Sequence, residues 1–278
     1  MTASPAPALP LAHGASMPQL ALGTWPMTGE QARDAVVQAI QAGYRHVDTA
    51  QQYGNEEAVG EGLRASGLPR EDLFITTKFN AEWHGEDLAQ QACVAAAKRL
   101  GVDYLDLLLI HWPNPWLDRY VSAWQGLIKC VDGGRVRAIG TSNFKPSHLE
   151  RLLEETAVAP DVNQVQLDPT LTRAETRAYH EAHGILTEAW SPLGRGGAVL
   201  EAPVITELAD RYAKSPAQVV LRWHMDLGQA AAPRSSNATR LAENLDIFDF
   251  RLTGQEVAAI SSLDRGESAA RDSDSEGH

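Results

Sequence analysis

Residues 43–56 read Gly-Tyr-Arg-His-Val-Asp-Thr-Ala-Gln-Gln-Tyr-Gly-Asn-Glu, a short β-favouring run that leads into Asp48 and is followed five residues later by Tyr53. Two later strand-like segments, 73–78 and 104–111, repeat this design and end in a lysine and a histidine. A carboxylate, a phenol, an ammonium and an imidazole therefore stand at or just past the C-terminal ends of successive runs. An α/β barrel carries its catalytic side chains at this end of its strands. The candidate catalytic residues are Asp48, Tyr53, Lys78 and His111.

Strand-like and helix-like segments alternate along the whole chain. Several strand-like runs are almost continuously apolar, as expected for strands buried on both faces. Eight such runs, each followed by a helix and without an internal linker, predict one (β/α)8 TIM-barrel domain over residues 1–278. The expected strands are 19–25, 44–49, 73–78, 104–111, 136–142, 162–167, 186–190 and 230–234. The expected helices are 30–42, 56–65, 86–100, 120–131, 148–155, 173–183, a longer stretch around 204–227, 240–245 and a last helix through 260.

Local signals mark where these helices begin and end. Glycines at 43, 101 and 184 follow helical patterns, where a left-handed residue is favoured. A Ser or Thr followed three residues later by Glu or Gln predicts a capping box at a helix start. The expected boxes are Thr28 with Gln31, Ser215 with Gln218, and Thr253 with Glu256.

The two ends of the chain differ from the barrel pattern. Residues 9–22 alternate around His13-Gly14-Ala15, which predicts a short N-terminal β-hairpin that caps the bottom of the barrel. Residues 265–278 are polar, charged and rich in Gly, Ser and Asp, which predicts a mobile C-terminal tail. Residues 1–8 are expected to be flexible as well.

Composition restricts the classes of partner. The net charge of −12 makes nucleic acid or an anionic membrane an unfavourable partner, and a 44% hydrophobic content is enough for a full core. The two cysteines, Cys93 and Cys130, fall in helix-like segments and are expected to be reduced thiols. The N-terminus has no basic residues and prolines interrupt it, so no signal peptide is expected. We expect a soluble, cytoplasmic, monomeric protein.

Several familiar signatures are absent from the sequence. It has neither the Gly-x-Gly-x-x-Gly dinucleotide fingerprint nor a phosphate-binding Gly-Lys-Ser/Thr loop. His180 and His183 are one residue too close for a zinc-binding helix, so we expect two surface histidines and no metal. Ser142 and Ser191 lack the glycines of a nucleophile elbow.

Further motifs complete a resemblance to the aldo-keto reductase superfamily. The resemblance runs from about residue 19 to 264, and the length and the Trp-Ser-Pro-Leu-Gly motif are most similar to bacterial 2,5-diketo-gluconate reductases. It implies a barrel enzyme that reduces an aldehyde or ketone to an alcohol with NADPH. The motifs are residues 43–56, Thr-Thr-Lys78, His111-Trp-Pro, Gly140-Thr-Ser-Asn143, Val162-Asn-Gln164, Trp190-Ser-Pro-Leu-Gly194, and Pro233-Arg-Ser235 through Arg240 and Glu243-Asn244.

The four candidate catalytic residues suit this reaction. A carbonyl that accepts a hydride needs a proton on its oxygen, and Tyr53 can donate one. Lys78 would lower the high pKa of the phenol, and Asp48 would pair with the buried ammonium. Neutral His111 would donate a hydrogen bond that orients the substrate. The structural alternative is a buried Asp48–Lys78 ion pair with Tyr53 and His111 as hydrogen-bonded core residues.

The resemblance also assigns residues to the cofactor, NADPH or NADP+, and to the substrate. Ser142, Asn143 and Gln164 would bind the carboxamide, Trp190 would stack on the nicotinamide, and residues 193–197 would cover the pyrophosphate. Two guanidiniums and a hydroxyl at the adenosine end would favour a 2′-phosphate. The cofactor residues are Thr24, Trp25, Asp48, Ser142, Asn143, Gln164, Trp190, Ser191, Leu193, Gly194, Arg195, Gly196, Arg234, Ser235, Arg240 and Asn244. The substrate residues are Trp25, Tyr53, Phe79, His111 and Trp112.

Two departures from the family pattern affect the choice of substrate. Asp168 stands where the family usually has histidine, and Asn80 stands where the gluconate reductases have tryptophan, with Trp83 as a nearby replacement. The substrate is therefore either a diketo-gluconate or a broader set of small aldehydes and dicarbonyls. A non-catalytic NADPH-binding sensor on the same fold is a further alternative. A metal-dependent barrel hydrolase would need more His, Asp and Glu at the strand ends.

Overall fold

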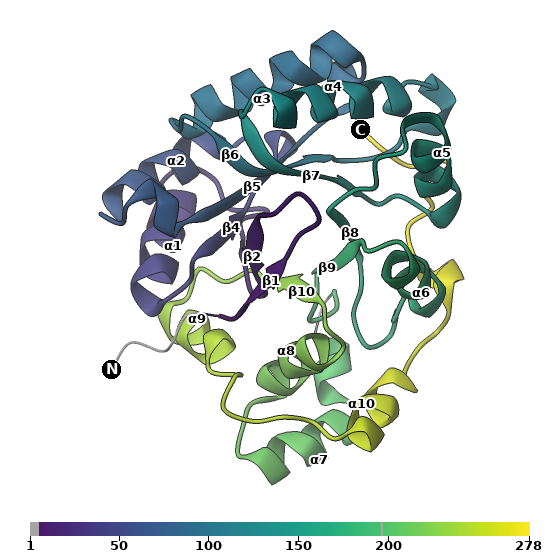
Figure 1. Ribbon diagram of the computed structural model, residues 1–278. Helices are drawn as coiled ribbons and strands as arrows, with labels where there is room; N and C mark the ends of the chain where they lie inside the picture. Colours follow the sequence, from purple (N-terminus) through teal and green to yellow (C-terminus); the bar gives the residue numbers. More distant parts are fainter. Residues whose placement is uncertain (1–5, 196) are drawn as a thin grey trace.

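The computed structural model describes residues 6–195 and 197–278. Within them, eight parallel strands lie in the order β10-β9-β8-β7-β6-β5-β4-β3, and parallel bridges Leu20–Ala231 and Gly23–Arg234 join the two edges. The predicted (β/α)8 barrel is therefore confirmed (Figure 1). The strands are β3 (Leu22–Gly23), β4 (His46–Asp48), β5 (Phe74–Phe79), β6 (Leu105–Ile110), β7 (Val136–Ser142), β8 (Val162–Gln166), β9 (Leu186–Trp190) and β10 (Ala230–Ala232).

Helices surround this barrel (Figure 1). The longer stretch expected around 204–227 is two helices. The first ends at Tyr212, and the second begins after the capping residue Ser215, with proline at its first position. The helices of the described residues are α1 (Gly29–Ala42), α2 (Glu56–Ala65), α3 (Glu86–Leu100), α4 (Tyr120–Asp132), α5 (Pro146–Thr156), α6 (Ala174–Ala182), α7 (Pro203–Tyr212), α8 (Pro216–Asp226), α9 (Ala238–Leu245) and α10 (Gly254–Ser261).

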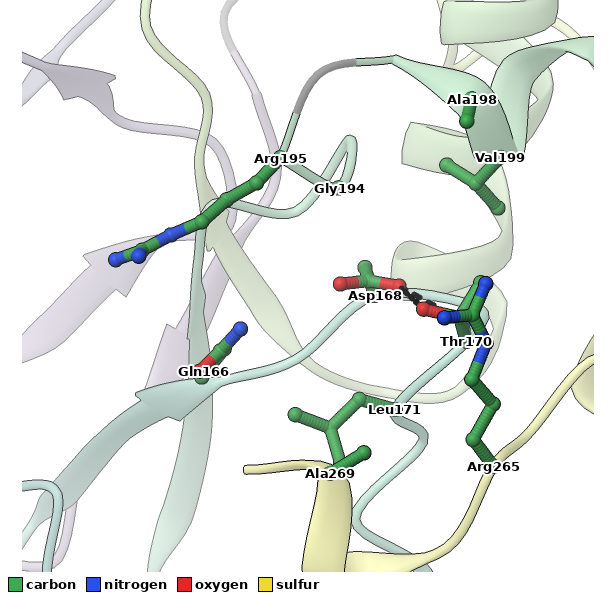
Figure 2. Close-up of a pocket in the computed structure, with 10 residues that line it drawn as sticks. All are labelled: Gln166, Asp168, Thr170, Leu171, Gly194, Arg195, Ala198, Val199, Arg265 and Ala269. Atoms are coloured by element: carbon green, nitrogen blue, oxygen red, sulfur yellow. Dashed lines mark hydrogen bonds between the residues drawn. The ribbon is translucent and has the colours of Figure 1, made fainter. Parts of the chain in front are cut away.

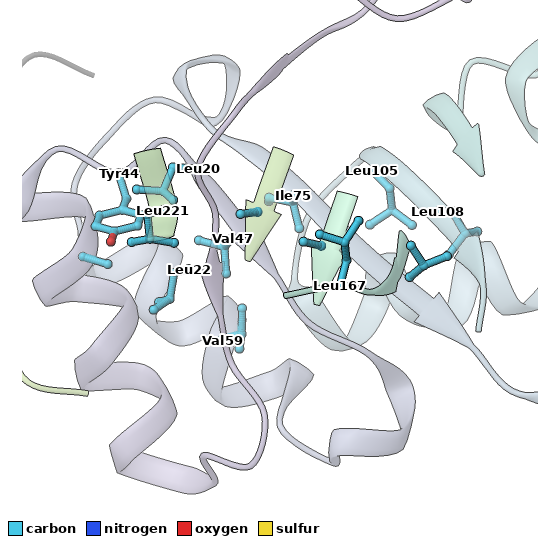
Figure 3. Packing of buried hydrophobic residues seen from close by; sticks show 14 of the residues in the cluster. Leu20, Leu22, Tyr44, Val47, Val59, Ile75, Leu105, Leu108, Leu167 and Leu221 are labelled. Carbon is cyan, nitrogen blue, oxygen red and sulfur yellow. The ribbon is translucent and has the colours of Figure 1, made fainter. Parts of the chain in front are cut away.

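Alternate residues of each strand face the barrel interior and the helices. In β6, Leu107 and Leu109 belong to the small interior cluster, whereas Leu108 and Ile110 belong to the large core between strands and helices. Figure 3 shows part of this outer core, in which strand residues pack beside helix residues. Because every second side chain of a strand faces the same side, the apolar interior residues of a strand show which residues near its C-terminal end also face the barrel interior.

The N-terminal hairpin closes the lower end of the barrel, as predicted. Strands β1 (Ala8–Pro10) and β2 (Ser16–Pro18) pair antiparallel. Leu11 and Met17 are buried against the interior residues of β5, β6, β7, β8 and β10. This apolar plug excludes water from the bottom and leaves the upper end for polar side chains.

Two local predictions were wrong. The side chain of Thr28 makes no capping hydrogen bond at the start of α1, and the Gln31 amide instead donates to Ser236 Oγ at 3.5 Å. His180 is fully buried rather than exposed, because its ring bonds Asn163 Nδ2 at 2.9 Å and Thr187 Oγ1 at 2.8 Å. His183 alone is exposed, as expected.

The other two capping boxes are confirmed. The Ser215 hydroxyl accepts from the backbone N–H of Gln218, and the Gln218 side chain accepts from the backbone N–H of Ser215. Thr253 and Glu256 form the same reciprocal pair at the start of α10. Among the residues described, no helix combines the length and apolar character needed to cross a bilayer.

Candidate active site

The upper end of the barrel gathers the predicted catalytic residues. Asp48 ends β4, Lys78 is the penultimate residue of β5, and His111 directly follows β6. Each lies two residues beyond an interior-facing position of its strand, so all three side chains point inward. Tyr53 comes from the short 3-10 helix η1 (Gln51–Tyr53), which lies directly above β4.

Lys78 is the centre of this group. Its Nζ donates to both carboxylate oxygens of Asp48 at 2.8 Å and to the carbonyl of Thr49 at 2.9 Å. Nζ also lies 3.5 Å from the Tyr53 hydroxyl and 5.3 Å from the centroid of its ring. Burial opposes the charged form of Lys78, but the Asp48 carboxylate more than compensates, so the pKa of Lys78 is raised above 10.5. Lys78 is therefore a fully buried ammonium ion.

Tyr53 keeps its proton in this environment. Burial raises the pKa of the phenol, Lys78 lowers it, and Asp48 raises it, with a net upward shift from 10.0. The expected influence of Lys78 is present, but it does not outweigh burial. Tyr53 is consequently protonated at neutral pH, which is the state that a proton donor needs.

His111 is held as a neutral ring beside Tyr53. Its backbone N–H donates to Phe79 at 3.1 Å, and its carbonyl accepts from Asn143 Nδ2 at 3.1 Å. The rings of His111 and Tyr53 meet edge to face with centroids 6.0 Å apart. Burial, followed by the positive charge of Lys78, lowers the pKa of His111 well below 6.5. The imidazole can therefore donate one hydrogen bond without carrying charge.

Glu188 of β9 is a buried group that the sequence analysis missed. Gln164 Nε2 donates to Glu188 Oε2 and to Asp48 Oδ1, at 2.8 Å each. Burial and then the charge of Asp48 raise the pKa of Glu188 to about 8. The signal was available, because Glu188 lies two residues before Trp190 and therefore on the same face of the strand.

A second polar cluster lies at the ends of β7 and β9. Trp190 Nε1 donates to Asn143 Oδ1 at 2.9 Å, and Asn143 Nδ2 donates to Ser142 Oγ at 3.1 Å. Ser142 Oγ in turn donates to the carbonyl of Gln164 at 3.0 Å. Asn143 and Ser191 have φ values of 63° and 53°, conformations that favour glycine. Such backbone strain is typical of functional sites.

The loop that follows Trp190 places a cation on the indole. Arg195 Cζ lies 5.2 Å from the centroid of the Trp190 ring. Beneath this loop is a cavity of about 210 Å³, whose lining residues are shown in Figure 2 and include none of the four predicted catalytic residues. Gly196, predicted to bind the cofactor, is outside the described residues. The cavity is lined by Gln166, Asp168, Thr170, Leu171, Gly194, Arg195, Ala198, Val199, Arg265 and Ala269.

The predicted adenosine end lies at the start of α9. Arg234 and Arg240 are exposed, and neither guanidinium has an ion-pair partner among the described residues. Ser235 and Asn244 are buried. Asn237 caps α9 by accepting from the backbone N–H of Arg240 at 3.0 Å, which fixes the start of the helix. Two unpaired cations beside a helix N-terminus form a site that suits an anion.

Comparison with known proteins agrees with this geometry. Residues 17–265 match the model of the aldo/keto reductase family. An aldo-keto reductase of Mycolicibacterium smegmatis is 48% identical over 261 residues, covering 94% of each chain. Methylglyoxal reductase DkgA of Escherichia coli is 44% identical over 265 residues, covering 95% of this chain and 96% of the relative.

A solved structure gives the same result. The Bombyx mori aldo-keto reductase in complex with NADP has a TM-score of 0.87 and 38% identity, covering 94% of each chain. The chain belongs to the aldo/keto reductase family. It is thus a member of a family of oxidoreductases.

The remaining predicted residues of this aldo/keto reductase lie around the same opening. Thr24 donates to the carbonyl of Asp48 at 3.0 Å, and Trp25 is 58% exposed at the rim. Trp112 is buried. Phe79 follows Lys78 and is therefore on the opposite face of β5, where it belongs to the outer core and meets His84 edge to face. The structure does not bring Phe79 into the catalytic group.

The two departures have different structural roles. Asp168 accepts from the backbone N–H and hydroxyl of Thr170 at 2.8 and 2.7 Å, so it stabilises the turn after β8 as well as lining the cavity. Asn80 lies two residues after Lys78 and is buried, and its amide donates to Gln52 Oε1 at 2.8 Å. Asn80 therefore connects the end of β5 to η1, the element that carries Tyr53.

The C-terminal segment also reaches the active site of this aldo/keto reductase. Residues 265–278, which composition predicted to be mobile, lie against the upper end of the barrel. His278 Nε2 is 3.2 Å from His111 Nδ1. Local sequence pattern contains no sign of this contact, because 167 residues separate the two histidines.

Proposed function

We propose that this protein reduces small aldehydes and dicarbonyls to alcohols with NADPH. The observation that carries the proposal is the position of Lys78 Nζ, which lies between the Asp48 carboxylate at 2.8 Å and the Tyr53 hydroxyl at 3.5 Å. If the Lys78–Asp48 ion pair served only stability, it would not require the protonated hydroxyl of Tyr53 beside Lys78. The cofactor, when bound, supplies the hydride for the substrate carbon.

Each catalytic residue then has a step of its own. His111 donates a hydrogen bond to the substrate oxygen and orients the carbonyl. Tyr53 gives its proton to that oxygen as negative charge develops there. Lys78 stabilises the resulting phenolate, and Asp48 keeps Lys78 charged and in place. Gln164 fixes Asp48 Oδ1 from the other side at 2.8 Å.

The residues present fit a nicotinamide cofactor. The Arg195 guanidinium lies 5.2 Å from the centroid of the Trp190 indole, so this ring can hold a planar group against its face. Gln164, Asn143 and Ser142 would bind the carboxamide. Arg195 and the loop backbone would bind the pyrophosphate at the 210 Å³ cavity, and Arg234 with Arg240 would bind the 2′-phosphate.

The relatives support dicarbonyls as the substrate class. DkgA is named a methylglyoxal reductase, and the sequence resembles 2,5-diketo-gluconate reductases. Methylglyoxal and diketo-gluconate both carry a carbonyl next to a second oxidised carbon. We further propose that the protein acts as a cytoplasmic monomer.

The consumption of NADPH by the purified protein tests the proposal. We expect turnover of methylglyoxal and other small dicarbonyls, with 2,5-diketo-gluconate and aromatic aldehydes in the same panel. Strong selectivity for diketo-gluconate would instead assign the narrower sugar-acid activity. NADPH binding without turnover of any carbonyl would contradict the catalytic proposal and indicate a sensor.

A further inference from the structure

Residues 265–278, here called the C-terminal strap, follow a defined course across the top of the barrel. In Figure 1 the yellow segment leaves α10, passes α6 and α5, and ends at the label C between α4 and α5. The backbone N–H of Arg265 donates to Thr170 at 3.0 Å, and Glu267 forms an ion pair with Arg173 at 2.9 Å. Further along, Lys145, the residue that precedes α5, pairs with Asp272 and Asp274. The strap therefore contacts the ends of several βα units.

The last two residues of the strap fit closely between β5 and β6. The carbonyl of His278 accepts from the backbone N–H of Ala81 at 3.2 Å and from Asn114 Nδ2 at 3.3 Å. A side chain at Gly277 would collide with the amide oxygen of Asn114. A larger residue at position 277 would therefore displace the Asn114 side chain, and the close fit places the next side chain over the candidate catalytic histidine.

The His278 ring meets His111 at one defined atom. Its Nε2 lies 3.2 Å from His111 Nδ1, with the two rings edge to face and centroids 4.5 Å apart. His278 also meets Trp112 edge to face, with centroids 6.0 Å apart. Among the described residues, His278 is the sole hydrogen-bond partner of His111 Nδ1, and His111 Nε2 has none. The nitrogen open to a substrate is therefore Nε2.

The hydrogen bond between two neutral imidazoles contains one proton, which is carried either by His278 Nε2 or by His111 Nδ1. Its position decides whether His111 Nε2 is a hydrogen-bond donor or an acceptor. Burial lowers the pKa of His111 well below 6.5, and partial burial followed by the charge of Arg271 lowers the pKa of His278, so both rings are neutral at neutral pH. If His278 donates, His111 Nδ1 accepts and the proton of His111 is on Nε2, where it can bond a carbonyl oxygen. If His111 donates instead, its Nε2 is a bare acceptor that would repel that oxygen.

We propose that His278 is a positioning residue whose Nε2–H donates a hydrogen bond to His111 Nδ1. This bond holds His111 in the tautomer whose Nε2–H donates to the substrate oxygen. This inference rests on the proposed carbonyl reduction. His278 contacts His111, which donates a hydrogen bond to the substrate, and does not contact the reacting atoms. Its contribution is to fix the orientation of His111 and the ring nitrogen that carries the proton.

Two substitutions separate the hydrogen bond from the packing. His278→Phe keeps an aromatic ring beside Trp112 but removes the donor, whereas His278→Gln keeps an N–H donor. We expect kcat for a small dicarbonyl to fall about five- to tenfold in His278→Phe, the size of one neutral hydrogen bond, and to recover in His278→Gln. His183→Phe, on the exposed end of α6, is the matched control.

A spectroscopic measurement tests the tautomer directly. Nitrogen-15 chemical shifts distinguish the protonated from the bare nitrogen of a neutral imidazole, and comparison with His111→Gln assigns the signals. We expect His111 to carry its proton on Nε2 in the parent protein and in His278→Gln, and to become a mixture in His278→Phe. An unchanged His111 tautomer in His278→Phe, or equal kcat in the Phe and Gln variants, would overturn the inference. Because this readout needs no turnover, it remains decisive even if the proposed reaction is wrong.

Discussion

Tyr53 is the residue on which the proposed chemistry depends most directly. Tyr53→Phe removes one hydroxyl but keeps the ring that lies edge to face with His111. We expect carbonyl reduction to fall by at least about 10²-fold, because among the described residues Tyr53 supplies the one hydroxyl within 3.5 Å of Lys78 Nζ, while NADPH binding is retained. Stopped-flow turnover and a fluorescence titration with NADPH measure the two effects. Turnover close to that of the parent protein would refute the role of Tyr53 as donor.

Glu188 predicts a pH dependence of stability. Its folded-state pKa of about 8 lies above the ordinary 4.5 because the carboxyl is buried near Asp48. The folded protein therefore binds this proton more tightly than the unfolded chain, and the resulting stability is complete below pH 4.5 and is lost as pH rises through 8. Glu188→Gln keeps an oxygen that can accept from Gln164 and carries no charge.

We expect the free energy of unfolding of Glu188→Gln to exceed that of the parent protein by on the order of a few kcal/mol at pH 9, and to differ little from it at pH 5. Urea unfolding at the two pH values measures this difference. Glu207→Gln, on the exposed side of α7, is the control and should show no such divergence. Parallel stability curves for Glu188→Gln and the parent protein across this pH range would mean that Glu188 is ionised in the fold.

Among the secondary-structure elements, the start of α9 should select the cofactor. Arg234 and Arg240 are exposed cations in a chain whose net charge is −12, so they form a local exception to its acidic surface. Replacing both with Met should weaken NADPH binding about 10²-fold or more and NADH binding far less, because a charged hydrogen bond contributes roughly 1.5–3 kcal/mol. Isothermal titration compares the two cofactors. Arg251→Met is the control, and equal losses for NADPH and NADH would exclude a 2′-phosphate contact.

The elements also show what the sequence could predict. Apolar periodicity located all eight barrel strands, because a strand buried on both faces leaves a continuous local signal. The positions of Asp48 and Lys78 at the C-terminal ends of successive strands then indicated that these two side chains meet. His180 was misjudged because its two hydrogen-bond partners, Asn163 and Thr187, lie on strands β8 and β9, outside the helical segment from which its exposure was predicted. A local motif cannot report such partners.

At the scale of the whole molecule, the C-terminal strap shows the same limit. Its polar composition predicted mobility, since it contains few apolar side chains to bury. In the structure its carboxylates instead meet cations of the barrel, with Asp272 and Asp274 at Lys145 and Asp274 Oδ1 also at His148 Nε2 at 2.9 Å. Exposed ion pairs are individually weak and are screened by salt, so the strap should open more readily than the barrel.

Charge reversal at Lys145 tests this arrangement. Lys145→Glu would face Asp272 and Asp274 with a like charge, so amide hydrogen exchange in residues 270–278 should accelerate about two- to tenfold, while the melting temperature shifts by no more than about 2 °C. Lys98→Glu on the exposed face of α3 makes the same charge change elsewhere and should leave the strap unaffected. Raising the salt concentration should accelerate exchange in the parent protein in the same residues. Exchange in the strap that is as slow in Lys145→Glu as in the parent protein would show that the seat of His278 between Ala81 and Asn114, rather than the ion pairs, holds the segment.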